Sequence, residues 1–219
     1  MGDQKFQHKK YSTPRHPWEA ARIEQEKEIL ERYGLKNKKE LWKSLSILDS
    51  FRTQARTLEG KMRYQDQYSM QQFKNMIRRL QRFNILNEGA TLDDVLSLKI
   101  DDILERRLQT LVFKMKLAAT MKQARQLITH GEISLGGRRV TIPGLMVEAS
   151  LEPTLSYDPD SPLMDELHPL RQAMLKSNKE KGEEKEAPAE AIVEENKETH
   201  ENEVKEPAKE GANYWQEQA

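Results

Sequence analysis

Lysine and arginine side chains recur at helical spacing along the first two thirds of the sequence, where they could contact phosphate groups. Lys74, Arg78 and Arg82 lie four residues apart, so on a helix they form one ridge. Such a ridge can neutralise phosphates along a nucleic-acid backbone, although it carries little information about base sequence. For any single helix, a merely solvated charged face is an equally good interpretation.

Further basic faces make chance a weaker explanation than RNA binding. Lys122 and Arg125 share one side of the helix expected over 121–130 with Gln126, and Arg138 and Arg139 lie in a hairpin that follows. An arginine on a small hairpin suits the shallow groove of RNA. The residues predicted to contact RNA are Lys9, Lys10, Arg15, Arg52, Arg56, Lys74, Arg78, Arg82, Arg106, Arg107, Lys114, Lys122, Arg125, Gln126, His130, Arg138 and Arg139.

Other residues capable of chemistry form no catalytic constellation. The acidic pairs at 93–94 and 101–102 stand in the first turns of expected helices, where carboxylates interact favourably with the helix dipole. The five histidines lack the spacing of metal ligands, so surface or loop imidazoles are the better interpretation. No phosphate-loop or nucleophile-elbow motif is present. The sequence therefore predicts no enzymatic activity, no metal and no cofactor.

The charge of the chain is unevenly distributed. The 219 residues include 36 basic and 36 acidic side chains, but residues 1–150 hold 28 basic against 18 acidic ones. The remaining residues hold 8 basic against 18 acidic ones. The first part should therefore attract polyanions, and the acidic end is a separate region of the chain. The absence of cysteine excludes disulfides and thiolate metal sites. With no signal peptide or apolar run of ~18 residues, we expect an intracellular protein without a membrane partner.

Apolar periodicity locates the helices of the first hundred residues. One is expected from Pro17 to Gly34, and a second over 38–59, with Arg52 and Arg56 away from its apolar side. A capping box formed by Ser69 and Gln72 is expected to open the third helix. The second and third helices would thus present the basic residues between 52 and 82.

The next stretch predicts helices followed by a tight hairpin. Thr91 opens a short helix, and the pattern over 100–115 predicts one long amphipathic face. A capping box at 120–123 starts a helix that Gly131 ends.

In the hairpin, a Gly–Gly loop at 136–137 would pair Ser134 with Arg139 on the solvent face and Ile133 with Val140 on the buried face. Ile142 would extend that buried face.

These elements predict an α+β protein in three parts. Residues 1–104 form a basic N-terminal arm and a helical RNA-binding portion. Residues 105–174 form a small module of helices packed on a short antiparallel sheet, with its return segment. Residues 175–219 are rich in glutamate and poor in large apolar side chains, so we expect a disordered acidic tail.

The module resembles a known family. RRLQT at 106–110, QARQLI at 123–128 and RRVTIP at 138–143 are similar to the RNA-binding module named after ribosomal small-subunit protein four. Pseudouridine synthases, a heat-shock protein and some tRNA synthetases carry this module too. KKYSTPRHPW at 9–18 and YGLKNKKELW at 33–42 resemble the archaeal branch of the ribosomal family itself. The resemblance covers roughly residues 1–170.

The resemblance implies a cytoplasmic protein of the small ribosomal subunit. It implies primary binding to the 5′ domain of the small-subunit ribosomal RNA, which nucleates assembly of the subunit body. It also implies contact with ribosomal small-subunit protein five and an influence on translational accuracy; homo-oligomers are not expected. The alternatives are an RNA-modifying or RNA-chaperone protein that uses the module for targeting, and a helical adaptor that binds only proteins.

Two residues depart from the family pattern. Lys116 stands where the family usually has glycine, so the turn takes another shape or the preceding helix continues. Glu132 replaces a histidine of the family pattern, and we expect its carboxylate to point away from phosphate.

Overall fold

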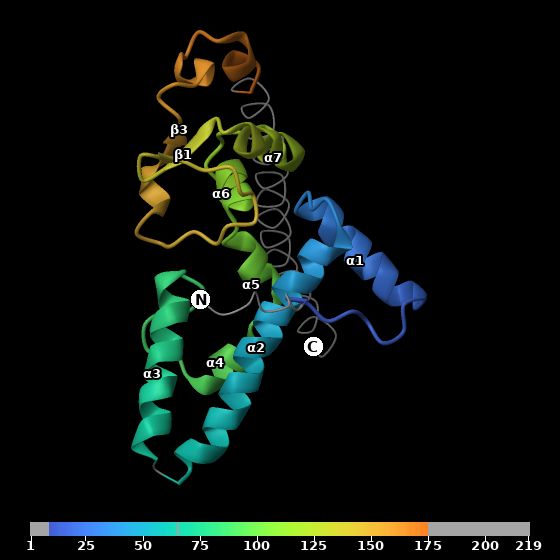
Figure 1. Cartoon of the computed structure of the whole chain (residues 1–219), viewed down its shortest axis with the longest axis vertical. Helices are drawn as coiled ribbons and strands as arrows, with labels where there is room; N and C mark the ends of the chain where they lie inside the picture. Colours follow the sequence, from blue (N-terminus) through green and yellow to red (C-terminus); the bar gives the residue numbers. More distant parts are fainter. Residues whose placement is uncertain (1–8, 65, 175–219) are drawn as a thin grey trace, which may run out of the picture. The chain divides into compact units, whose positions relative to one another are not determined.

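The helices α1 to α7 and a short sheet are found in the computed structural model, which describes residues 9–64 and 66–174 (Figure 1). The predicted fold class, helices with a small antiparallel sheet, is confirmed. Residues up to Arg171 form one compact unit. The tail expected over 175–219 lies outside the described residues. The predicted division at 104–105 stays a prediction.

The first helix, α1 (Ala20–Arg32), begins later than predicted. Glu19 is its N-cap, so Pro17 precedes the helix and does not open it. The predicted end is confirmed, because Gly34 follows with a φ of 57°. A Cβ at this position would also lie 2.8 Å from the Cβ of Met121. Glycine is therefore required here by both its left-handed backbone and the close approach of a later helix.

The helices α2 (Lys38–Met62) and α3 (Gln67–Arg82) form a hairpin whose two arms lie side by side (Figure 1). Their facing sides bury Ala55 and Leu80 completely. The capping box predicted at Ser69 and Gln72 is wrong. Asp66 caps α3 by accepting hydrogen bonds from the backbone amide of Tyr68 and, at 2.6 Å, from the buried Ser69 hydroxyl.

The single long helix predicted over 100–115 is two helices, α5 (Ile100–Glu105) and α6 (Leu108–Lys114). A returning segment interrupts it: Val147 donates its amide to the Arg106 carbonyl, and Leu108 donates to the Leu145 carbonyl. Arg107 pairs with Met146 as an isolated β-bridge. The apolar periodicity continues across the break, so the sequence pattern does not reveal it. The short α4 (Leu92–Ser97) precedes α5, capped by Thr91 as predicted.

The helix α7 (Met121–His130) leads into a sheet of order β2-β1-β3. Its strands are β1 (Ile133–Leu135), β2 (Arg138–Arg139) and β3 (Leu155–Tyr157), and short 3₁₀ turns span Glu152–Thr154 and Pro162–Met164. The predicted pairing of Ser134 with Arg139 is confirmed. The solvent position predicted for Ser134 is wrong, because β3 adds to the other edge of β1 and leaves Ser134 2% exposed. Ile142 does not extend the buried face, since it is 61% exposed.

Candidate nucleic-acid interface

The ridge on α3 faces solvent. Lys74, Arg78 and Arg82 are all exposed, and the predicted four-residue spacing places them along one side of a regular helix. Among the residues that the structure describes, only Arg82 of these three has an acidic partner: its Nε lies 3.2 Å from the Glu148 carboxylate, and its side chain remains 61% exposed. These guanidinium and ammonium groups are therefore available to an external anion.

The two arginines of α2 have different surroundings. Arg52 is half-buried and donates a hydrogen bond to the Leu98 carbonyl, which joins α2 to the end of α4. Arg56 is exposed. The helical spacing placed both on one side, but only Arg56 presents its charge to solvent without supporting a neighbouring element.

The N-terminal arm runs along α2. The Tyr11 ring lies 6.1 Å from the Trp42 ring, centroid to centroid, and the Ser12 amide donates to the Ser46 hydroxyl. These contacts hold the segment on which the predicted residues Lys9, Lys10 and Arg15 are exposed.

The basic face of α7 divides in two. Lys122, Gln126 and His130 lie four residues apart and are exposed, so they form one solvent-facing stripe. Arg125 lies on another side of the helix and is half-buried. The sequence grouped Lys122 with Arg125, whereas the fold separates them.

Arg125 is bound to Glu40 of α2. Two hydrogen bonds join its guanidinium to the two carboxylate oxygens, at 2.6 and 3.1 Å. The same carboxylate accepts from Arg107 at 2.9 Å, and the Arg107 side chain is only 6% exposed. Burial alone would raise the pKa of Glu40, but hydrogen bonds from the two arginines outweigh it and the pKa is lowered. We call Glu40, Arg107 and Arg125 the carboxylate clamp.

Gln109 supports the carboxylate clamp from within the core. Its side-chain nitrogen donates to the carbonyls of Gly34 and Met121, at 3.0 and 2.9 Å. Its side-chain oxygen accepts from Arg125 at 3.3 Å. One buried amide thus links the end of α1, the start of α7 and the clamp.

The remaining predicted cations of the module are exposed or paired. Arg138 is exposed in the hairpin, whereas Arg139 donates to the carbonyls of Gly131 and His130 at 2.7 and 3.0 Å. Arg106 is buried and bound to Glu152 at 2.8 Å. Lys114 lies 3.0 Å from Glu105 with half of its side chain exposed.

The two departures from the family pattern have structural explanations. Lys116 adopts a φ of 60°, so it occupies the left-handed turn itself, and the helix ends before it. Of the two outcomes expected, an altered turn or a continued helix, neither is observed. The Glu132 carboxylate accepts a hydrogen bond from the Ser161 hydroxyl. It is thereby held by the segment after β3.

Sequence reasoning missed Glu40 and Gln109. Glu40 is an acid in the first turn of a helix, a position that the dipole alone explains, and its partners lie 67 and 85 residues away. Gln109 offered one signal, a polar side chain inside an otherwise apolar run. In the part of the chain that the structure describes, no group of three or more acidic or histidine side chains could hold a metal ion. No helix there is long and apolar enough to cross a bilayer.

Comparison with known proteins agrees with the resemblance of the module. A family model described as the S4 domain matches residues 106–152. A small ribosomal subunit protein uS4 from Picrophilus torridus is 60% identical over 183 residues, which cover 84% of this chain and 100% of the relative. The uS4 protein of Thermoplasma acidophilum is 56% identical over 194 residues, covering 89% and 98%. That of Halobacterium salinarum is 49% identical over 161 residues, covering 74% and 91%.

Proposed function

The chain belongs to the family of small ribosomal subunit protein uS4, and we propose that it binds the 5′ domain of the small-subunit ribosomal RNA through its exposed cations. The family is a structural, non-enzymatic one, so this chain is a constituent of the small ribosomal subunit in the cytoplasm and carries an RNA-binding S4 domain. An RNA-modifying enzyme that uses the module for targeting is thereby excluded.

This interface is supported by one observation: the fold buries some of the basic residues and leaves the others exposed. Arg106, Arg107 and Arg125 are engaged with carboxylates and are buried or half-buried, so they build the module. The cations proposed to meet phosphate directly are exposed: Lys9, Lys10, Arg15, Arg56, Lys74, Arg78, Arg82, Lys122 and Arg138. Lys114 and Arg139 are exposed as well, but they bind Glu105 and two backbone carbonyls. Gln126 and His130 extend this set with exposed hydrogen-bonding groups.

Two finer roles belong to the same proposal and are supported by the family resemblance. The protein nucleates assembly of the subunit body by binding early to the RNA, and it contacts ribosomal small-subunit protein five to influence accuracy. Reconstitution of subunits without this protein should stall before the body forms. Normal assembly without it would contradict the nucleating role.

The RNA interface can be tested by the salt dependence of binding. Replacing Lys74 and Arg78 with glutamine removes two exposed cations from α3. The slope of log K against log salt for a 5′-domain RNA should then fall by roughly 1.4–1.8, from about 0.7–0.9 per phosphate contact.

The matched control replaces Lys27 and Lys43, two exposed cations on α1 and α2 outside the predicted interface. This double variant should retain the wild-type slope. Equal slopes for wild type and both double variants would show that the cations of the α3 ridge face solvent and contact no phosphate.

A further inference from the structure

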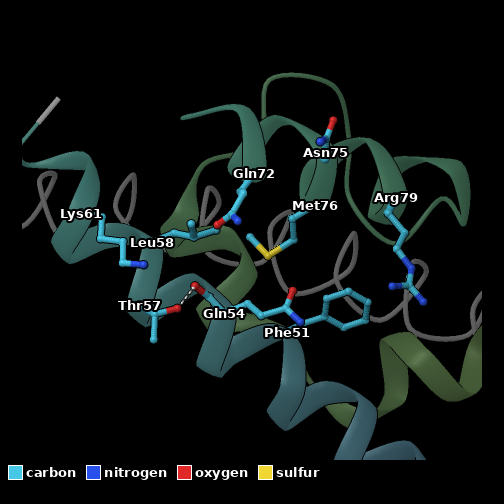
Figure 2. Close-up of a pocket in the computed structure, with 9 residues that line it drawn as sticks. All are labelled: Phe51, Gln54, Thr57, Leu58, Lys61, Gln72, Asn75, Met76 and Arg79. Atoms are coloured by element: carbon cyan, nitrogen blue, oxygen red, sulfur yellow. Dashed lines mark hydrogen bonds between the residues drawn. The ribbon is translucent and has the colours of Figure 1, made fainter. Parts of the chain in front are cut away.

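A groove lies between α2 and α3 on a side that the proposed phosphate contacts do not use. It has a volume of about 420 Å³, within the ~300–1,000 Å³ typical of small-ligand sites. Phe51 and Leu58 from α2 and Met76 from α3 give it an apolar floor, of which only a small part is accessible because each residue is 5–6% exposed. Its floor residues belong to the core that α2 and α3 share, and the close-up shows them between the two helices (Figure 2).

Two amide side chains line this groove from opposite helices. Gln72 points from α3 toward α2, and Gln54 lies along α2 toward the Phe51 ring (Figure 2). Each primary amide offers both a donor and an acceptor. Paired donors and acceptors above an apolar floor suit a flat heterocycle that has polar edges and apolar faces.

The charge of the groove is positive. Lys61 and Arg79 are among its nine lining residues, and none of the nine is acidic. The Arg79 guanidinium carbon lies 5.6 Å from the centre of the Phe51 ring, so a cation–π contact holds this arginine over the groove floor. At the N-cap of α3, the pKa of the Asp66 carboxyl is lowered chiefly by the hydrogen bond from Ser69 and also by the charge of Lys61. Asp66 does not line the groove.

An aromatic residue continues the same stripe of α3. Tyr68 precedes Gln72 by four residues, so it lies one turn further along that face. Its side chain is 69% exposed. Exposed aromatic rings beside cations are the usual stacking platforms for unpaired bases.

We propose that this groove binds one unpaired nucleotide of RNA. The base lies on Leu58 and Met76 with its polar edge on Gln54 and Gln72, and the flanking phosphates meet Lys61 and Arg79. A peptide could fill the apolar floor, but the two cations and the lack of a lining acid favour the polyanion. The inference rests on the proposed function, because the nucleotide would belong to the small-subunit RNA.

Neighbouring glutamines provide a matched test. Gln72 faces the groove, whereas Gln71 is exposed and is not one of the lining residues. Gln71 donates to Asn75, a lining residue at the edge of the groove whose side chain points away from α2 (Figure 2). Full-length wild type, Gln72→Ala and Gln71→Ala should each be bound to 5′-domain RNA. Reagents that modify the Watson–Crick edges of unpaired bases then report which bases each protein protects.

Wild type and Gln71→Ala should protect one unpaired base that Gln72→Ala leaves reactive, with the rest of the footprint unchanged. A Gln54→Ala/Gln72→Ala double variant should bind about tenfold more weakly, as expected for losing one two-point base contact. Identical footprints and affinities would overturn the groove proposal while leaving the proposed function intact. If the footprints and affinities are identical but the variants fail to retain another ribosomal protein, the groove binds a protein partner, and the nucleotide proposal is overturned as well. Absence of binding by the wild type would instead contradict the proposed function.

Discussion

At the scale of single residues, charge in this protein has two uses. Glu40 receives three hydrogen bonds from Arg107 and Arg125, and the three side chains carry one net positive charge. Arg107 is nearly inaccessible, so removing its carboxylate partner would leave a cation in a poorly solvated place. The carboxylate clamp is therefore a structural connection between α2 and the module.

Replacing Glu40 with glutamine should lower the free energy of unfolding by roughly 1–3 kcal/mol, between the values for exposed and buried ion pairs. The change keeps the shape of the side chain and removes only its charge. Chemical denaturation at pH 7 measures the loss. Glu24→Gln on the exposed side of α1 is the control and should change stability little.

The stability difference between wild type and Glu40→Gln should depend on pH. The pKa of Glu40 is lowered from about 4.5 in the folded state, so its contribution is complete above the unfolded pKa. It is lost as the pH falls through the folded pKa. The stability difference between wild type and Glu40→Gln should thus be constant near neutrality and shrink below about pH 4.5. A difference that grows on acidification would contradict the clamp.

At Lys116 we expect a substitution to increase stability instead of lowering it. Its φ of 60° is costly for a residue with a Cβ, so Lys116→Gly should stabilise the protein by about 0.5–1 kcal/mol. Lys114→Gly, at the last residue of α6, should instead destabilise it, by less than the roughly 1 kcal/mol of a helix interior. Thermal unfolding of both variants separates the two effects. Destabilisation by glycine at both positions would show that the turn is not strained.

At the scale of elements, the helical hairpin depends on a small shared core. α2 packs against α3, α4 and α5, and Leu80 is fully buried where α3 meets this group. The apolar periodicity of α2 and α3 predicted which side of each helix is buried, because amphipathic helices bury the side on which apolar residues repeat. It did not predict the break between α5 and α6, which comes from a segment about forty residues later in the chain.

Leu80→Ala should therefore destabilise the protein by about 2–5 kcal/mol, the usual cost of emptying a well-packed position. Met70→Ala, on the exposed start of α3, should cost far less because that side chain is 44% exposed. Denaturant titration gives both values. A small loss for Leu80→Ala would mean that the hairpin core repacks around the gap.

At the scale of the whole molecule, cations that stabilise the fold and cations that bind RNA should be separable. Lys122→Gln should reduce the salt slope for RNA by about 0.7–0.9 without changing the melting temperature. Arg125→Gln should lower the melting temperature because it opens the carboxylate clamp, with a smaller change in slope per folded molecule. Equal slope changes from both variants would place Arg125 at the RNA as well.

The sequence by itself determined where helices occur, though not the break between α5 and α6, and it determined their apolar sides, the hairpin register and the family of the chain. These are local or short-range properties. Thr91 begins a helix and Gly131 ends one, each through backbone geometry within a few residues. It also determined which residues are basic, but not which ones solvent can reach. Lys122 and Arg125 are three residues apart, yet only Arg125 lies on the side of α7 where Glu40 and Gln109 bind it in the fold.

Tertiary structure alone decided the neighbours of β1 and the course of the chain between α5 and α6. Ser134 alternates correctly for a solvent-facing position, yet β3 covers it from a distant part of the sequence. The groove between α2 and α3 likewise could not be predicted from the sequence, because its lining comes from two helices whose separation is set by their packing. Periodicity specifies which side of an element is buried, whereas the identity of the element that covers it depends on long-range contacts.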